Sequence, residues 1–457
     1  AATVVARADV EISTNPTANM ICSGGVGAPT AMDAVLNVTD LVNLLGAGNL
    51  TVTTTGFEVQ ANDLHVTAPF SWTAPNTLTL DAFHSITVTG AVSNEGTGGV
   101  SLVTDDGGSG GTLSFLDSGH MHFSNVKDAL AINGTKYKLA ATIKKLVFDI
   151  VAHPRGAFAL ATSYNAKHDG AYTSSPIAIP FTGSFSGLGN TISNLEIENI
   201  TDSSIGLFAE VASSGSISGL NLKNVVVQGG AVAGGLVGLN NGVVANSSTS
   251  GLINATSAGG LVGFNSGIIF RSSSSARVHA SSQAGGLVSV HSAGLIAESF
   301  ATGKLNYNHQ PSDRLDNGGL VGDVFAPIRD SYAEGDLNNS LTFEGGLVGF
   351  INETAGGLIS TSYSTGMPKA GRHMNPISGG FIGYIYQAAA TISNCYWDTT
   401  TSGTLVGVGD GGDETGITGL TTSQLQSGLP TGFDPEVWGE DANINGGYPY
   451  LIDNPSE

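Results

Sequence analysis

Gly234-Gly-Leu-Val-Gly238 is the stretch that decides the fold, because close copies of it recur as far as Gly383. The copies begin at Gly234, Gly259, Gly285 (which ends in Ser289), Gly318, Gly345 and Gly379 (as Gly-Gly-Phe-Ile-Gly). Periods of about 20 to 50 residues, the range in which all these spacings fall, are typical of units that bury their apolar face only by stacking on their neighbours. The sequence therefore predicts a stacked repeat.

A second phrase, which begins with serine and ends with glycine, follows several of these copies by about half a period. Its copies are Ser247-Ser-Thr-Ser-Gly251, Ser299-Phe-Ala-Thr-Gly303, Ser331-Tyr-Ala-Glu-Gly335 and Ser362-Tyr-Ser-Thr-Gly366. Apolar pairs such as Leu236-Val237 and Val243-Val244 are too short for an amphipathic helix and indicate short strands. Equivalent strands of stacked repeats lie about 4.8 Å apart. We therefore predict an all-β fold, a right-handed parallel β-helix (β-solenoid) with short helical excursions.

The repeated Gly-Gly pair has two structural interpretations. It either forms a corner that needs a positive φ angle, or lies where neighbouring repeats approach too closely for a Cβ atom. A phosphate-binding loop is not expected, because the chain has no Gly-x-x-x-x-Gly-Lys-[Ser/Thr] sequence. The glycines are structural under both interpretations.

The repeats resemble those of a known family. Gly-Gly-Leu-Val-Gly followed by Asn-x-Gly (240–242 and 265–267) and by Ser-[Phe/Tyr]-Ala-Thr-Gly is similar to the GLUG repeat of bacterial surface proteins and streptococcal immunoglobulin A proteases. The flanking segments 181–195 and 395–425 resemble those of filamentous-haemagglutinin-like proteins. The resemblance covers roughly residues 55–452 and implies the fold but no single activity. The His-Glu-x-x-His motif of the proteases is absent, so protease activity does not carry over.

The pattern divides the chain into five parts. Residues 1–50 lack periodicity and are expected to form an N-terminal cap or assembly segment. Residues 51–125 alternate as the first β-helix strands, and residues 126–180 interrupt the pattern. Residues 181–403 hold the GLUG-type repeats, and residues 404–457 are expected to form an acidic C-terminal cap.

Two helices and one further repeat are expected outside the GLUG-type segment. Residues 31–45 are helix-like, and residues 141–152 have apolar residues at helical spacing before Pro154. Segment 64–72 aligns with segment 86–94, and this offset also falls within the range of stacked repeats. The alignment predicts that stacked strands also occupy the N-terminal part of the chain.

The chain is acidic, with 37 Asp and Glu against 16 Lys and Arg and a net charge of −21. Such a chain repels nucleic acid and anionic membrane surfaces, so neither is an expected partner. No run of about 18 apolar residues occurs, so we expect no membrane insertion. End-to-end self-association and a carbohydrate or host cell-surface ligand remain as classes of partner.

We expect an exported protein with the signal peptide removed, because the chain begins with small residues at Ala1 and only 12 % of it is charged. Cys22 and Cys395 flank the repeats. Along a straight solenoid their separation would far exceed the roughly 7 Å limit between the Cα atoms of a disulfide. They are either separate thiols or are joined head to tail between subunits.

Candidate metal ligands are few. Asp410, Asp413 and Glu414 offer the carboxylate oxygens that calcium prefers, although the loop lacks the ligand spacing of an EF-hand. Calcium at this loop is the one cofactor considered. His120 and His122 project from the same face of a strand, but no further Cys or His stands nearby to complete a ligand set.

A polysaccharide lyase or glycosidase on the same scaffold is the alternative function. Such enzymes need carboxylates, or a carboxylate with Arg or Lys, that converge on one exposed sheet. The densest acidic group, which Arg314 and Arg329 accompany, comprises Asp313, Asp316, Asp323, Asp330, Glu334, Asp336 and Glu344. Its members fall at irregular intervals, so we predict no catalysis there and name no catalytic residue.

The expected function is that of an exported, rod-like structural or adhesin-type protein of the bacterial cell surface or extracellular matrix. End-to-end contact between residues 1–50 and 404–457 of successive subunits would extend it into fibres. A third possibility is a passive sugar-binding module that uses the Trp and Tyr side chains of the caps, such as Trp438, Tyr448 and Tyr450.

Overall fold

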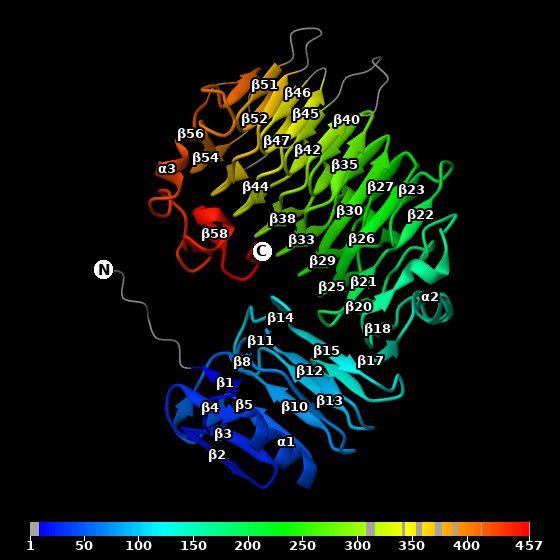
Figure 1. The fold of residues 1–457 in the computed structure, drawn as a ribbon, viewed down its shortest axis with the longest axis vertical. Helices are drawn as coiled ribbons and strands as arrows, with labels where there is room; N and C mark the ends of the chain where they lie inside the picture. Colours follow the sequence, from blue (N-terminus) through cyan, green and yellow to red (C-terminus); the bar gives the residue numbers. More distant parts are fainter. Residues whose placement is uncertain are drawn as a thin grey trace. The chain divides into compact units, whose positions relative to one another are not determined.

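The structure is a computed structural model that describes residues 9–307, 316–340, 343–352, 359–370, 377–386, 391–412 and 414–456. Strands make up 47 % and helices 7 % of it, so the prediction of an all-β fold is confirmed. The chain forms two compact units (Figure 1). The first comprises residues 1–146, 156–164 and 184–191, and the second comprises residues 147–155, 165–183 and 192–457.

The first unit consists mainly of parallel strands in three sheets. One sheet is parallel throughout, in the order β14 (Leu113–Phe115), β11 (Ile86–Val88), β8 (Leu64–Val66), β1 (Val10–Ser13) and β4 (Ala34–Asn37). A second contains β2 (Met20–Ser23), β3 (Val26–Pro29), β5 (Leu50–Thr53), β10 (Leu78–Asp81), β13 (Val100–Val103), β16 (Leu130–Ile132), β17 (Thr135–Ala140), β18 (Ala157–Leu160) and β20 (Ser184–Ser186). The third contains β15 (His120–Phe123), β12 (Ala91–Asn94) and β9 (Phe70–Trp72), and β6 (Thr55–Gly56) pairs with β7 (Val59–Gln60).

The predicted alignment of segments 64–72 and 86–94 is confirmed in the first unit. Leu64 pairs with Ile86 across β8 and β11, and Trp72 pairs with Asn94 across β9 and β12. Leu64 and Ile86 are fully buried, as are most apolar side chains of these strands. Large side chains that alternate along short strands therefore fill the interior of this unit.

β1 lies between β4 and β8, although both follow it in the chain. Residues 1–50 therefore contribute strands to the sheets in addition to α1 (Val38–Ala47). The prediction of a helix over residues 31–45 was wrong at its start, because buried and half-buried side chains alternate along β4. The side chain of Asn37 accepts the N–H of Thr39 at 2.8 Å and begins the helix directly after the strand.

The segment 126–180, expected to interrupt the pattern, continues the second sheet. β16 is parallel to β13, β17 is antiparallel to β16, and β18 is parallel to β17. α2 (Ile143–Ala152) agrees with the helix expected over residues 141–152. Three elements span the points at which the chain crosses between the units: α2, β19 (Tyr164–Asn165) and β21 (Thr191–Ser193).

The second unit consists of parallel strands in the order of the repeats, from green to orange in Figure 1. One sheet contains β23 (Ser204–Ile205), β27 (Val232–Gly234), β31 (Ser257–Gly259), β36 (Gln283–Gly285), β41 (Asp316–Gly318), β46 (Phe343–Gly345) and β51 (Ile377–Gly379). A second contains β24 (Phe208–Val211), β28 (Val237–Asn240), β32 (Val262–Asn265), β37 (Val288–His291), β42 (Val321–Val324), β47 (Val348–Ile351), β52 (Ile382–Ile385) and β55 (Val408–Asp410). A third series contains β25 (Ser216–Ser218), β29 (Val243–Ala245), β33 (Ile268–Phe270), β38 (Leu295–Ala297), β43 (Ile328–Arg329), β48 (Ile359–Ser360) and β53 (Ile392–Ser393).

A fourth sheet of this unit carries the serine-initiated phrase and the strand after it. Its strands include β22 (Glu196–Glu198), β26 (Asn221–Gln228), β30 (Ser248–Ala255), β34 (Ser273–Ser274), β35 (Arg277–Ala280), β39 (Phe300–Ala301), β40 (Leu305–Tyr307), β44 (Tyr332–Ala333), β45 (Leu337–Ser340), β49 (Tyr363–Ser364), β50 (Pro368–Ala370), β54 (Cys395–Asp398) and β56 (Ile417–Leu420). The remaining elements are the 3₁₀ helices η1 (Ala166–Asp169) and η3 (Asn445–Gly447), the helix α3 (Thr422–Leu425), and β57 (Trp438–Gly439) paired with β58 (Tyr450–Leu451).

The predicted repeat register is confirmed residue by residue. Gly234 pairs with Gly259, which pairs with Gly285, and the same column continues through Gly318, Gly345 and Gly379. The two longer spacings, which follow Gly285 and Gly345, leave this register unchanged.

Close approach between repeats, and not a positive φ angle, explains the paired glycines. A Cβ atom on Gly260 would overlap the carbonyl oxygen of Gly286 in the next repeat, and one on Gly259 would lie 2.6 Å from the backbone nitrogen of Ser289. None of the paired glycines has a left-handed φ. Six equivalent corners of successive repeats are instead non-glycine residues with a left-handed φ between 46° and 52°, namely Asn246, Arg271, Glu298, Asp330, Thr361 and Asn394.

Each of these corners is followed by a buried side chain that links successive repeats. The hydroxyl of Ser299 donates to the carbonyl oxygen of Ala297 at 2.8 Å and accepts the N–H of Ser272 at 3.1 Å. The same two contacts recur along the column, which consists of Ser247, Ser272, Ser299, Ser331 and Ser362. Cys395 continues the column, and its thiol donates to the carbonyl oxygen of Ser393 at 3.3 Å.

A second buried column explains the Asn-x-Gly phrase. The side chain of Asn240 donates to Asn265 Oδ1 at 2.6 Å, and Asn265 Nδ2 lies 3.0 Å from Nδ1 of His291. The other ring nitrogen of His291 lies 3.0 Å from the carbonyl oxygen of Pro327. Burial lowers the pKa of His291 to about 4, although the hydrogen bonds with Pro327 and Asn265 act to raise it. A neutral histidine thus ends a column that begins with asparagines.

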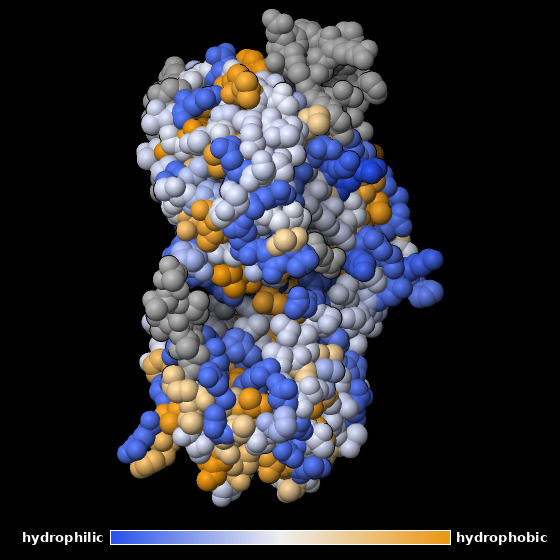
Figure 2. All heavy atoms as spheres, turned by 60° about the vertical axis from the view of Figure 1, so that its left-hand side comes forward, coloured by the Kyte–Doolittle hydropathy of each residue, from blue (hydrophilic) through white to orange (hydrophobic). Residues whose placement is uncertain are grey.

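Among the described residues, no helix combines the length and the apolar character that are needed to cross a membrane. On the face drawn in Figure 2, hydrophobic residues are interspersed in small groups among hydrophilic ones.

Candidate functional site

The C-terminal segment packs along a column of aromatic side chains in the second unit. The second residue of the serine-initiated phrase supplies this column, and the rings of Phe300, Tyr332 and Tyr363 stack with centroids 4.8 and 5.0 Å apart. Trp438, 1 % exposed, lies 6.1 Å from the ring of Tyr332 and 5.9 Å from that of Tyr363. Trp438 is therefore part of a hydrophobic core, which leaves its face unavailable for stacking on a sugar.

The end of this segment returns to an earlier corner of the unit. Arg271 forms ion pairs of 2.7 Å with both Glu298 and Asp453, and the side chain of Asn454 donates to the carbonyl oxygen of Glu298 at 2.9 Å. Residues 421–456 thus cover the side of several repeats, whereas the sequence pattern predicts a cap at the end of the stack.

The predicted calcium loop makes backbone contacts instead. Asp413 lies outside the described residues. Asp410 accepts the N–H of the adjacent Gly411 at 2.7 Å. One carboxylate oxygen of Glu414 accepts the N–H groups of Gly407 and Val408. This part of the chain therefore uses its carboxylates to hold backbone N–H groups.

The position of Glu414 has a structural meaning. In earlier repeats the equivalent N–H donates to a carbonyl of the next repeat, as Leu347 N does to Phe381 O at 2.9 Å and Phe381 N does to Gly407 O at 3.0 Å. Gly407 belongs to the last repeat of this sheet, and the carboxylate of Glu414 takes the place of the next carbonyl. A charged side chain thus ends the ladder.

The acidic side chains of the 313–344 segment that the structure describes are distributed over several strands and turns. Asp313 and Arg314 lie outside the described residues. Asp316, Asp323 and Glu344 are buried on three different strands, β41, β42 and β46.

The remaining members of that acidic group already have partners. Asp330 forms an ion pair of 3.0 Å with Arg329 and accepts the hydroxyl of Thr361. Asp336 forms an ion pair of 3.3 Å with Lys304. Glu334 accepts the hydroxyl of Tyr363 at 3.3 Å, and burial raises the pKa of its carboxyl to about 7. These contacts hold the segment together.

His120 and His122 lie on β15, as predicted. His120 Nδ1 lies 2.8 Å from the carbonyl oxygen of Ser118, and His122 Nε2 lies 3.8 Å from a carboxylate oxygen of Glu95. The structure therefore gives these histidines one polar partner each.

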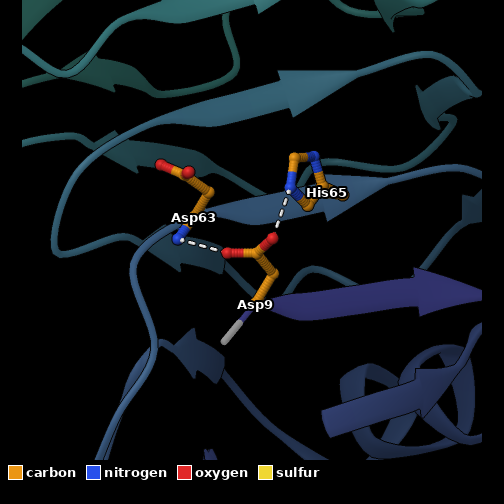
Figure 3. A group of neighbouring side chains, drawn as sticks. All are labelled: Asp9, Asp63 and His65. Carbon is orange, nitrogen blue, oxygen red and sulfur yellow. Dashed lines mark hydrogen bonds and ion pairs between the residues drawn. The ribbon is translucent and has the colours of Figure 1, made fainter. Parts of the chain in front are cut away.

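A different group in the first unit brings three potential metal ligands together. Asp9, Asp63 and His65 each offer one donor atom, and these atoms lie within 4.8 Å of one another (Figure 3). His65 Nε2 lies 3.4 Å from Asp9 Oδ2. Asp9 directly precedes β1, and Asp63 directly precedes β8, so the parallel pairing of these two strands creates the group.

Neighbouring groups fix the carboxylates of this cluster. Asp63, 7 % exposed, accepts the N–H of Ser85 at 2.8 Å through Oδ1, which also lies 2.8 Å from His84 Nδ1. Asp9 Oδ1 accepts the backbone N–H of Asp63 at 3.3 Å, which leaves Asp9 Oδ2 directed at His65 (Figure 3).

The charge around His65 favours its protonated form in the absence of a metal. The hydrogen bond with Asp9 raises the pKa of His65 most strongly, and the charges of Asp9, Asp63 and Glu11 raise it further against the opposing effect of burial. Glu11 pairs with His65 across β1 and β8. The cluster therefore has a negative potential that attracts cations.

An open polar groove of about 700 Å³ lies along the second unit. Glu198, Gln228 and Asn254 occupy equivalent positions of successive strands on its wall, and Thr256 and Ser281 complete it. The groove offers amide, hydroxyl and carboxylate groups.

Both cysteines are free thiols. Burial raises the pKa of Cys395 to about 12. Burial and the charge of Asp40 raise the pKa of Cys22. A disulfide between subunits through Cys395 would require its repeat to open, so the structure favours the interpretation of separate thiols.

Comparison with known proteins finds only partial similarities. No family model matches the chain. A stretch of 77 residues, 17 % of this chain, is 38 % identical to halomucin from Haloquadratum walsbyi, and it spans 1 % of that protein. The crystal structure of a proposed immunoglobulin A1 protease from Bacteroides ovatus aligns with 66 % of this chain and 86 % of its own, with a TM-score of 0.42 and 16 % identity. These similarities do not assign the chain to a family.

Proposed function

We propose that the chain is an exported, rod-like structural or adhesin-type protein of the bacterial cell surface or extracellular matrix, built on a right-handed parallel β-helix of GLUG type. The register of the Gly-Gly phrase over six successive copies carries this proposal. Backbone contacts, serine hydroxyls and stacked aromatic rings link the same positions in neighbouring repeats. Such continuous links suit a protein that must resist bending along its stack.

The polysaccharide-active enzyme is less well supported. Of its candidate carboxylates, Asp316, Asp323 and Glu344 are buried, and Asp330, Glu334 and Asp336 have polar partners within the chain. A sugar-binding role through the C-terminal aromatic residues has less support as well, because Trp438 is buried. The polar groove along Glu198, Gln228 and Asn254 offers hydrogen bonds to a polar ligand such as a carbohydrate.

The state of the C-terminal end distinguishes a finite rod from a fibre subunit. Glu414 occupies the place where the next repeat would present a carbonyl to β55. Removing this carboxylate exposes two N–H groups of an edge strand, and such edges promote association. We therefore propose that the isolated chain stays unassembled and that Glu414 contributes to this.

Light scattering and negative-stain electron microscopy test the proposal on the purified chain, Glu414→Ala and the control Asp410→Asn. Asp410 is an exposed acidic residue at the end of the same edge strand, β55. We expect a concentration-independent particle of 46.2 kDa for the wild type and the control, and concentration-dependent association for Glu414→Ala.

If the wild-type chain forms fibres, the proposal that it stays unassembled is wrong, and the chain is a fibre subunit. Cleavage of acidic or neutral polysaccharides that is lost in Asp330→Asn would contradict the structural role and support the enzyme. Surface labelling of the producing cell tests export, and a protein protected from the label would contradict it.

A further inference from the structure

We propose that Asp9, Asp63 and His65 bind one divalent transition-metal ion, with zinc as the best fit, and that this ion fastens β1 to β8. This site lies in the first unit and is independent of the repeat phrases. It goes beyond the proposed structural role, because it names a ligand and a residue set.

The distances fit a bound metal ion as well as the ion pair that forms without one. His65 Nε2 and Asp9 Oδ2 are 3.4 Å apart, which is within ion-pair range and longer than the commonest N–H···O distance of about 2.9–3.0 Å. A tetrahedral zinc ion with bonds of about 2.0–2.1 Å separates its ligand atoms by about 3.4 Å. The third donor, from Asp63, lies within 4.8 Å of both others.

The chemistry of the donors selects the class of metal. Imidazole nitrogen favours zinc and its neighbours in the first transition series, whereas calcium needs six to eight oxygen ligands. Two carboxylates neutralise the charge of a divalent ion. Three protein ligands leave one tetrahedral position for water. That position has access to solvent, since the side chains of His65 and Asp9 are 35 % and 29 % exposed.

The surroundings hold the ligands in place, as they do in known metal sites. His84 and the N–H of Ser85 both engage Oδ1 of Asp63, so neither occupies its Oδ2. Ser85 Oγ in turn accepts the N–H of Thr112 at 3.0 Å. Asp9 uses Oδ1 for the N–H of Asp63 and directs Oδ2 at His65.

The position of the site in the fold indicates what the ion would do. β1 is inserted between β4 and β8, and Asp9 is the residue directly before it. An ion bound there joins the start of the first strand to Asp63 and His65, which stand much later in the chain. It would therefore oppose the detachment of β1, which is an early step if the N-terminal end of the chain unfolds locally.

Calorimetric titration of the full chain with zinc chloride, after treatment with EDTA and dialysis, tests the site. We expect one tight site in the wild type, no such site in His65→Ala and Asp9→Asn, and binding weakened about 10- to 100-fold in His84→Ala, which removes a group that positions Asp63. His122→Ala is the matched control, because His122 also faces one carboxylate but lies outside the three-residue group. It should bind zinc as the wild type does.

Two further measurements keep the result interpretable. Circular dichroism establishes that each variant folds, and cobalt(II) absorption reports a tetrahedral environment that disappears with His65→Ala. Zinc should raise the melting temperature of the wild type and of His122→Ala but not that of His65→Ala. Absence of a zinc site in the wild type, or a site that survives in folded His65→Ala and Asp9→Asn, would overturn the proposal.

Discussion

The two units use parallel strands in different ways. In the first, the interior is filled by large alternating side chains such as Leu64, Leu80 and Ile86, and the strand order departs from the chain order at β1. In the second, each series of equivalent strands follows chain order, and the backbone of one repeat touches the backbone of the next at the paired glycines.

This difference shows what a strict repeat requires. Side chains of different sizes compensate one another within a core, so the strands of the first unit can vary in sequence while they keep the alternation. Backbone contact leaves no such freedom, because every strand must present the same shape at the same place. The repeated phrase is therefore conspicuous in the second unit and nearly invisible in the first.

The largest loss of stability is expected when a side chain is added at a paired glycine, where the backbones of neighbouring repeats are in contact. Gly260→Val should cost more than about 4 kcal/mol or prevent folding, because its Cβ would overlap the carbonyl oxygen of Gly286. Leu80→Ala in the first unit leaves a cavity and should cost about 2–5 kcal/mol. Ser273→Ala, on the same repeat as Gly260, should change stability by less than about 0.5 kcal/mol. Chemical denaturation of the three variants measures the order, and equal midpoints for Gly260→Val and Ser273→Ala would refute the explanation of the glycines.

The second largest effect is expected when the C-terminal segment, residues 421–456, detaches from the aromatic column. Trp438→Ala should cost about 3–5 kcal/mol of docking free energy, since the ring is 1 % exposed and lies 4.5 Å from the ring of Phe433. Limited proteolysis should then cleave residues 421–456 first. Phe57→Ala, at a side chain 88 % exposed, is the control. Unchanged cleavage in Trp438→Ala would mean that the aromatic column does not hold this segment.

A pH-dependent effect of intermediate size is expected at His291. Its folded-state pKa of about 4 lies below the ordinary value of 6.5, so the unfolded chain binds more protons between these values. The folded state should lose up to about 3 kcal/mol as the pH falls from 6.5 to 4. His291→Asn, which continues the column of Asn240 and Asn265, should remove this loss.

Glu334 changes stability with pH in the direction opposite to His291. The effect of His291 must therefore be measured as the difference between His291→Asn and the wild type. The pKa of Glu334 is raised from 4.5 to about 7, so this carboxyl lowers stability as the pH rises through that range. The difference in melting temperature between the two chains, measured from pH 4 to 7, isolates His291. A difference that does not change with pH would rule out this role of the histidine, and His122→Asn serves as the control.

The smallest effect is expected at a left-handed corner. Thr361 has φ 46°, which strains a β-branched residue, whereas Asn246 and Asn394 occupy equivalent corners with a tolerated side chain. Thr361→Asn should stabilise the second unit by about 1 kcal/mol or less, and Asn246→Thr should destabilise it by a similar amount. If both variants shift the melting temperature in the same direction, backbone strain does not determine the residue at this corner.

The sequence predicted those parts of the fold that short repeated motifs determine. Gly234 and its five copies give the register of the second unit, and the alignment of Leu64 with Ile86 gives part of the first. The position of β1 between β4 and β8 was not predicted. The alternation of residues in Val10 to Ser13 indicates a strand, but it does not indicate which strands pair with it. For the same reason residues 433–451 were assigned to a cap, since nothing local shows that their aromatic side chains meet Tyr332 and Tyr363.

The candidate metal site could be predicted only in part. Asp63 and His65 stand at alternate positions, which places both side chains on one face of a strand, as it does for His120 and His122. Asp9 stands much earlier in the chain and joins them only through the pairing of β1 with β8. Calcium ligands were instead sought in an acidic loop, where Glu414 binds backbone N–H groups.

The uniform register also makes the length of the second unit adjustable by whole repeats. Removing residues 259–284 would join Ala258 to Gly285 and bring Asn240 opposite His291, as Asn265 is now. Ser247 would then meet Ser299, as Ser272 does at present. We expect the shortened chain to melt cooperatively near the wild-type temperature, while a cut of half that size should abolish folding. Evolution can lengthen or shorten such a stack by unequal exchange between repeats, without first repairing the surfaces that meet.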